Sequence, residues 1–367
     1  ISIDYLSAFL AMAPMLSETQ DKEYTLLDEE TPRAGELIGI IATHMGRAAP
    51  RKYIPKSLMA FLLNAGLSKF IGTSAESLSF LEPFSFDTGP ANKIGQQLGL
   101  KKPNIQVAIL KTVDYFAATH FGRSPSAFKA GTTGYVNVEG HKTFLGGDRE
   151  KATHVYLHGL PLNSDSWAPV IEQVPESALF ADLPGLGRST VNGPVDHTAW
   201  LRNVCSDLQA PSTIVAHSLG TGFAIDYACA YPERVKGLIL IAPYFLQTRP
   251  GRNLKFTFTH ADMKNLLTGD QDIGRDVVDS AYLSLKNPGG MRSIGRYLSE
   301  ARQLSHRQMY RQRLKSLDLP VLLISGEYDP LVEPVGNHQS IEISGTGHFP
   351  QTTHSKEVAM LINEFSA

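Results

Sequence analysis

A serine with small neighbours lies where the sequence predicts a strand running directly into a helix. Residues 213–216 are apolar or β-branched and lead to Ser218, and a helix-like stretch follows it. This pattern predicts a nucleophile elbow, a tight turn that strains the serine backbone and needs small residues two positions before and after it. Ala216 and Gly220 meet that need, although Ala216 stands where the motif usually has glycine. We expect nucleophilic chemistry at the Ser218 hydroxyl; the alternative is a serine that only caps the helix starting near Leu219.

Size and composition set wide bounds around this chemistry. The chain has 367 residues, enough for two domains that each bury a sizeable core. Charged residues make up 19% of the chain and the net charge is −2, so a nucleic-acid partner is not expected. No His, Cys or carboxylate cluster has metal-ligand spacing, and no metal is expected.

The same sequence gives expectations about location. Only Cys205 and Cys229 are present, both in predicted helices, which argues against a disulfide framework and favours a reducing, cytoplasmic compartment. The longest apolar stretches fall well short of the roughly 20 residues that cross a bilayer, so no transmembrane segment is expected. The first residues lack the pattern of a signal peptide. Because the chain does not start with Met, a fragment of a longer protein remains open, and the oligomeric state is not predicted.

Residues 1–129 are predicted to form a mainly helical N-terminal domain, with helices at 4–15, 31–46, 55–67 and 105–119 and a strand at 23–27. This region resembles the C-terminal, substrate-side part of extended short-chain dehydrogenases and epimerases. The resemblance rests on Ile3-Asp4-Tyr5-Leu6, Tyr24-Thr25-Leu26-Leu27-Asp28 with Thr31, Ile54-Pro55 and Ser85-Phe86-Asp87-Thr88. No G-x-G-x-x-G turn is present to hold a pyrophosphate, so we expect no nicotinamide cofactor. An NAD(P)-linked oxidoreductase fragment is the remote alternative.

Residues 130–367 follow a different pattern, in which short apolar strands alternate with helices. A hairpin is predicted at 135–138 and 142–145, and further strands at 153–157, 178–181, 235–241 and 321–325. A helical insertion occupies about 244–317, and the last helix is predicted at 355–365. Continuous apolar strands separated by helices indicate a mostly parallel, doubly wound sheet with both faces covered. The predicted fold class is therefore α/β.

Several motifs occur in an order that resembles α/β-hydrolase serine esterases. They are His158-Gly159, Asp182-x-Pro184-Gly185-x-Gly187-x-Ser189, the elbow at Ser218, Gly326-x-x-Asp329 and Gly347-His348. The resemblance implies an α/β-hydrolase fold for about residues 130–367, with the helical insertion as a cap over the catalytic serine. In such a fold the Asp182–Ser189 segment shapes a turn, and Asp182 with Arg188 is expected to form a structural ion pair.

The resemblance also implies a catalytic triad of Ser218, Asp329 and His348. A serine hydroxyl needs a base to take its proton and a third group to orient that base. Asp329 follows a predicted strand, and His348 lies in a glycine-bounded loop before the last helix. Glu327 is a rival for the role of the acid. The stretch between Asp329 and His348 is short for the helix and strand that usually separate acid and base.

An oxyanion formed at the substrate carbonyl needs donors that are already in place. By resemblance these are the backbone N–H groups of Leu160 and Leu219. The supporting residues are expected to be His158, Gly159, Ala216, His217 and Gly220, with His217 read as structural. Pro161 gives the first loop a likeness to epoxide hydrolases, but those enzymes use an aspartate where this chain has Ser218, so epoxide hydrolysis is disfavoured.

Together these features predict a cofactor-independent serine hydrolase that cleaves carboxylic esters of small to medium, apolar, small-molecule substrates through an acyl-enzyme. Lactones, thioesters and carbon–carbon bonds are handled by relatives with the same triad, and they remain open. A catalytically silent binding protein is a further alternative, in which Ser218 would not react with a fluorophosphonate.

Overall fold

In the computed structural model the chain forms two compact units, Ile1–Val113 and Asp114–Ala367. The predicted boundary near residue 130 stays a prediction. The residues that the structure describes are 1–52, 54–68, 73–81, 85–123, 127–129, 131–175, 177–247, 278–279, 281–282, 285, 289–329, 331 and 338–367.

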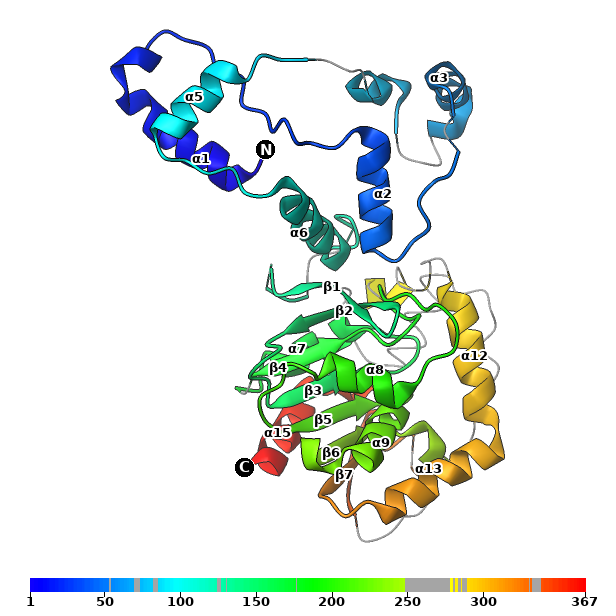
Figure 1. The fold of residues 1–367 in the computed structure, drawn as a ribbon. Coiled ribbons are helices and arrows are strands. Elements are labelled where there is room, and N and C mark those ends of the chain that lie inside the picture. Colours follow the sequence, from blue (N-terminus) through cyan, green and yellow to red (C-terminus); the bar gives the residue numbers. More distant parts are fainter. Residues whose placement is uncertain are drawn as a thin grey trace. The chain divides into compact units, whose positions relative to one another are not determined.

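The first unit is built from helices (Figure 1). They are α1 (Ile3–Met12), η1 (Ala13–Met15), η2 (Ser17–Thr19), α2 (Ala34–His44), α3 (Lys56–Leu62), η3 (Leu63–Leu67), η4 (Ala75–Leu81), α5 (Gly89–Gln97) and α6 (Ile105–Ala118), the last of which continues into the second unit. A small apolar cluster joins Tyr5 and Phe9 of α1 to Ile94 of α5.

The strand predicted at residues 23–27 is wrong. The segment forms no strand in the structure, and within the described part of the first unit no β-strand is present to pair with it. Tyr24 and Leu26 pack instead against the cluster around α1. A strand needs a partner for its backbone hydrogen bonds, and a β-branched or aromatic run alone does not supply one.

The described residues of the second unit form an eight-stranded sheet in the order β1-β2-β4-β3-β5-β6-β7-β8. The strands are β1 (Thr133–Val138), β2 (His141–Gly147), β3 (His154–Leu157), β4 (Ala178–Ala181), β5 (Ser212–His217), β6 (Val235–Ile241), β7 (Val321–Gly326) and β8 (Gln339–Ile343). The β1–β2 and β2–β4 pairs are antiparallel, and every other pair is parallel. The predicted α/β class and mostly parallel, doubly wound sheet are confirmed.

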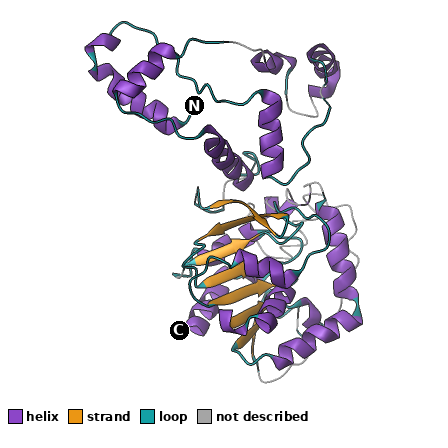
Figure 2. Ribbon diagram, viewed as in Figure 1, coloured by secondary structure: helices purple, strands orange, loops and turns teal. Residues whose placement is uncertain are grey.

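Both faces of this sheet are apolar because successive strand residues point to opposite sides. Ile214 and Ala216 of β5 belong to one buried cluster, and Val215 between them belongs to another. The first cluster packs under α8 (His197–Val204), α9 (Gly220–Ala230), α12 (Gly290–Arg302) and α13 (Leu304–Ser316), and the second under α7 (Ala168–Ile171) and α15 (Ser355–Ser366). Figure 2 shows the orange strands lying between helices. The sheet is thereby a rigid platform for its loops.

The edge strand β8 was not among the predicted strands. Its residues alternate between exposed and more buried positions, and only Ile343 is fully buried. A strand that covers the core with one face has few apolar residues, and this one is short. It supplies the expected strand between Asp329 and His348, and it pairs in parallel with β7.

The predicted insertion at 244–317 is helical where the structure describes it. It contains η7 (Tyr244–Leu246), α12 and α13, while residues 248–277 lie outside the described residues. The remaining short helices of the unit are η5 (Ser164–Trp167), η6 (Pro232–Arg234) and α14 (Pro350–Thr353). Among the helices described, none combines the length and the apolar character needed to span a bilayer.

Candidate active site

Ser218 occupies the turn between β5 and α9, as the sequence predicts. Its φ of 46° is the left-handed conformation that residues with a side chain rarely adopt. Hydrogen bonds to the main chain of Ser218 fix the turn: the Ser218 N–H donates to the Ile241 carbonyl at 2.9 Å, and the Thr221 side-chain hydroxyl donates to the Ser218 carbonyl at 2.5 Å. Strain of this kind persists only where the surrounding structure enforces it. The elbow is therefore a built feature of the sheet edge.

Small residues let the elements around Ser218 approach closely. A Cβ added at Gly220 would lie 2.7 Å from the carbonyl oxygens of Leu157 and His158, so α9 could not start against the end of β3 with any larger residue. Ala216 is fully buried in the core. At Gly159 an added Cβ would lie 2.7 Å from the Ser218 Cβ. The two glycines keep the turn after β3 and the elbow packed together at the carboxyl edge of the sheet.

The base and the acid are brought together with Ser218 at this edge. His348 Nε2 lies 3.0 Å from Ser218 Oγ, and His348 Nδ1 lies 2.7 Å from Asp329 Oδ2. With an ionised Asp329, Nδ1 carries the proton and donates to the carboxylate, so Nε2 accepts from the serine hydroxyl. The rival Glu327 accepts from the backbone N–H of Gly345 at 2.8 Å and makes no contact with the imidazole that the structure shows. The geometry therefore favours Asp329.

The environment keeps the Asp329 carboxylate ionised. Burial acts to raise its pKa, but the hydrogen bond and charge of His348 and a hydrogen bond from Gln247 outweigh that effect and hold the pKa below its ordinary value. The side chains of His348 and Asp329 are 25% and 22% exposed, which leaves the pair accessible from solvent. An ionised acid can orient the imidazole and stabilise its protonated form.

His217 precedes the nucleophile but points away from it. Its Nε2–H donates to the His348 carbonyl at 2.8 Å. Burial first, and then the charge of His348, hold the pKa of His217 well below its ordinary value, so the ring is neutral. His217 therefore supports the main chain of the loop that carries His348.

The two amides expected to form an oxyanion hole belong to neighbouring turns. Within the described part of the chain, neither the Leu160 N–H nor the Leu219 N–H donates to a protein acceptor. The loop of Leu160 is held by His158, whose Nδ1–H donates to the Gly159 carbonyl at 3.0 Å and whose Nε2 accepts from the Leu183 N–H at 2.9 Å. Burial lowers the His158 pKa, so this ring too is neutral. Both amides are thus available to a ligand atom.

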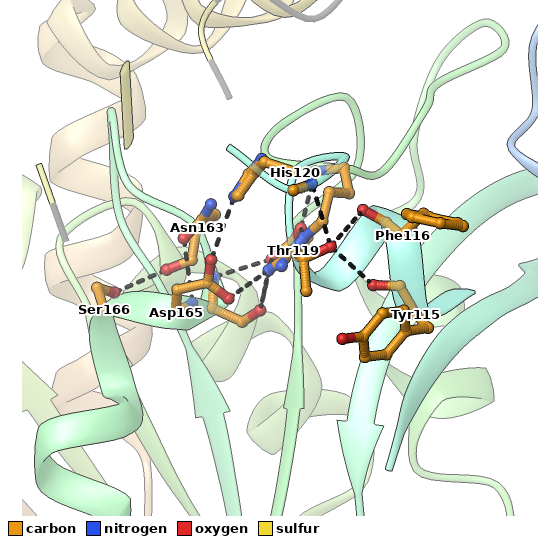
Figure 3. Close-up of polar contacts among 11 residues, drawn as sticks. Tyr115, Phe116, Thr119, His120, Asn163, Asp165 and Ser166 are labelled. Atoms are coloured by element: carbon orange, nitrogen blue, oxygen red, sulfur yellow. Dashed lines mark hydrogen bonds and ion pairs between the residues drawn. The ribbon is translucent and has the colours of Figure 1, made fainter. Parts of the chain in front are cut away.

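A buried ion-pair network supports the same loop. Arg188 Nε donates to Asp182 Oδ2 at 2.8 Å, which confirms the predicted ion pair, and Arg188 Nη2 donates to Asp165 Oδ1 at 2.7 Å. Figure 3 shows His120 facing Asp165, with His120 Nε2 3.4 Å from Asp165 Oδ2. The Ser164 N–H donates to Asp182 Oδ1 at 2.8 Å. These contacts tie the segment after β3 to the turn after β4.

One residue at the site is absent from the sequence-based prediction. Gln247 Nε2 lies 2.8 Å from Asp329 Oδ2 and 2.7 Å from His348 Nδ1. A glutamine at the start of a predicted insertion has no distinctive motif. The only available indication was its place shortly after the carboxyl end of β6, where strands of a parallel sheet present their functional groups. Among the described residues, no group of three His, Cys, Asp or Glu could hold a metal ion.

Comparison with known proteins matches residues 155–361 to the alpha/beta hydrolase family. A pimeloyl-acyl-carrier protein methyl ester esterase of Xanthomonas oryzae pv. oryzae is 29% identical over 261 residues, which cover 64% of this chain and 98% of that protein. The biotin biosynthesis bifunctional protein BioHC of Teredinibacter turnerae is 26% identical over 250 residues, 58% of this chain but only 44% of that longer protein.

Among solved structures, the carboxylesterase CesB (YbfK) from Bacillus subtilis superimposes with a TM-score of 0.51 at 18% identity, covering 64% of this chain and 91% of that chain. At this identity the likeness shows the fold alone. These matches are to hydrolases, and the resemblance of residues 1–129 to a dehydrogenase is not borne out by them.

Proposed function

The chain belongs to the alpha/beta hydrolase family, and on that premise we propose that this carboxylic ester hydrolase forms an acyl-enzyme on Ser218. The observation that carries the proposal is the continuous set of contacts from Ser218 Oγ through His348 to Asp329, at 3.0 and 2.7 Å. Such an array is what an unactivated hydroxyl needs in order to attack an acyl carbon at neutral pH.

In the first half of the reaction, Ser218 Oγ attacks the ester carbonyl while His348 Nε2 takes its proton. The Leu160 and Leu219 amides would donate to the oxygen that becomes negative, and each such donor is worth on the order of 3 kcal/mol of transition-state stabilisation. Asp329 orients the ring and stabilises its protonated form. His348 then returns the proton to the leaving alcohol, and the acyl group stays on Ser218.

In the second half, water takes the place of the alcohol. His348 accepts a proton from the water molecule as it attacks the acyl carbon, and the same two amides stabilise the second oxyanion. Collapse releases the carboxylic acid and returns the proton to Ser218. The cycle uses only groups of this chain and one water molecule.

We propose small to medium apolar acyl esters as the substrate class, in a cytoplasmic setting. Support for an ester comes from the Xanthomonas relative, whose name states a methyl ester of an acyl chain on a carrier protein. Methyl esters of medium-chain acids are therefore the first compounds to test. Thioesters, lactones and carbon–carbon bonds are the comparison substrates, since the same triad can act on them.

The test is hydrolysis of p-nitrophenyl esters of increasing acyl length, followed by the matching methyl esters. We expect turnover with a burst of p-nitrophenol, covalent labelling of Ser218 by a fluorophosphonate, and a loss of kcat of about 10⁴-fold or more in Ser218→Ala. An unlabelled Ser218, or a Ser218→Ala variant as active as the wild type, would refute the proposal.

A further inference from the structure

Backbone contacts anchor Gln247 beside the loop that carries Asp329. It directly follows η7, and its backbone forms an antiparallel bridge with Leu331, two residues beyond Asp329. Its carbonyl accepts a hydrogen bond from the Arg307 guanidinium of α13. From this anchored position the Gln247 side chain reaches the Asp329 carboxylate.

The Gln247 side chain then shares one atom with the base. Oδ2 of Asp329 lies 2.8 Å from the Gln247 amide nitrogen and 2.7 Å from His348 Nδ1. Only the amide nitrogen can face this oxygen, because an ionised carboxylate accepts and cannot donate. The Gln247 amide nitrogen also lies 2.7 Å from His348 Nδ1, so the three atoms form a small triangle. When Nδ1 is protonated, two N–H donors therefore face the same carboxylate oxygen and crowd each other.

We infer that Gln247 is a positioning residue, which holds the Asp329 carboxylate for His348 and at the same time limits the basicity of that imidazole. The inference rests on the acyl-enzyme mechanism proposed above. Part of the carboxylate's hydrogen-bonding capacity goes to the amide, and the amide N–H dipole opposes positive charge at Nδ1. Both effects disfavour the imidazolium. Loss of the amide is therefore expected to move the acid limb of the pH–rate profile to higher pH.

Other charged or titratable groups near the pair come from several elements. His217 at the end of β5 lies with its ring centroid 5.0 Å from that of His348 and is neutral. Arg307 of α13 reaches the Gln247 carbonyl, and Glu327 accepts from the Gly345 N–H in the loop before His348. Because none of these groups hydrogen-bonds to Oδ2 in the structure, the effect of the amide on the shared oxygen can be tested separately.

The experiment measures kcat/KM for a p-nitrophenyl ester from pH 5 to 9 in the wild type and in Gln247→Met and Gln247→Leu, which fill similar space without a donor. In both variants we expect the acid limb, the low-pH side of the plot of kcat/KM against pH, to move to higher pH by about half to one unit. The plateau value of kcat should be several-fold lower, with little change in KM. The rate of inactivation by a fluorophosphonate should show the same shift without ester turnover. A residue that served only to stabilise the fold would lower the melting temperature and leave the limb in place.

The matched control is Gln209→Met, an exposed glutamine just before the amino end of β5, at the opposite edge of the sheet. It should keep the wild-type profile. An active wild type whose acid limb coincides with that of the folded Gln247 variants overturns this inference alone, as does loss of folding in both variants, which would make the residue structural. A wild type that neither turns over esters nor labels at Ser218 refutes the proposed function together with it.

Discussion

The nucleophile and the acid–base pair are held in place by different means, although they meet at one edge of one sheet. Ser218 is 7% exposed and lies between two fully buried elements, β5 and the start of α9. Asp329 and His348 lie on loops flanking the edge strand β8, with about a quarter of each side chain exposed. Main-chain conformation and close packing fix the first group, and side-chain hydrogen bonds fix the second.

This difference predicts which kinds of substitution should damage each region. Around Ser218, glycines allow backbones to approach to a distance that excludes a Cβ. Around the acid–base pair, His217 donates to the His348 carbonyl and Gln247 donates to the Asp329 carboxylate. Added volume should therefore damage the nucleophile side through the fold, whereas loss of a donor or acceptor should damage the acid–base side with the fold intact.

The largest expected effect distinguishes the two carboxylates of the acid–base side. Asp329→Asn should lower kcat/KM by about 10³- to 10⁴-fold, because an amide cannot stabilise the protonated imidazole and favours the wrong tautomer. Glu327→Gln is the matched variant and should stay within about threefold of the wild type, since an amide oxygen can still accept from the Gly345 N–H. Ester hydrolysis at pH 8, with thermal melting of both variants, measures this. Comparable losses in the two would contradict the assignment of the acid.

A smaller effect is expected on stability when the glycines that follow Ser218 are replaced. Gly220→Ala should lower the free energy of unfolding by about 1–3 kcal/mol or more, because its Cβ would meet two backbone carbonyls that cannot move aside. Gly222→Ala lies two residues further along α9, where a Cβ would meet side-chain atoms of Tyr244 and Tyr310 at 3.2 and 3.4 Å. It should change stability by less than about 1 kcal/mol. Equal urea midpoints for the two variants would argue against the packing described.

The smallest expected effect concerns pH. The pKa of Asp329 is lowered in the folded protein, so its ionised form stabilises the fold above the unfolded-state pKa of about 3.9, and that contribution disappears as the pH falls through the folded-state value. The stability difference between the wild type and Asp329→Asn at pH 6 should therefore shrink below about pH 4. Urea unfolding at a series of pH values measures it. A difference independent of pH would mean that the carboxylate is not stabilised by its partners.

The sequence predicted the parts of the site that depend on unusual residues. A strained serine needs small neighbours, so Ala216 and Gly220 marked the elbow, and glycines marked the loops of Asp329 and His348. The strands with two buried faces were predicted closely because they are apolar along their whole length. At 178–181 and 235–241 the predicted bounds are those of β4 and β6.

What the sequence could not supply depends on partners that are distant along the chain. β8 was missed because only one of its faces is buried, and residues 23–27 were wrongly assigned because no neighbouring strand exists in the described part of their unit. Gln247 was missed because its role comes from a bridge to Leu331 and from Asp329, more than 80 positions away. Glu327 and Asp329 could be told apart only by where their oxygens point.

The edge position of β8 has a consequence for how this protein would fail on warming. Within the described sheet, β8 pairs with β7 alone. An edge strand of this kind opens locally at a lower free energy than the central strands of a sheet. The imidazole follows this strand by five residues, so thermal fluctuations would separate it from the hydroxyl while β5 and α9 are still intact. We therefore expect warming to abolish the catalytic activity reversibly, at temperatures below that of global unfolding.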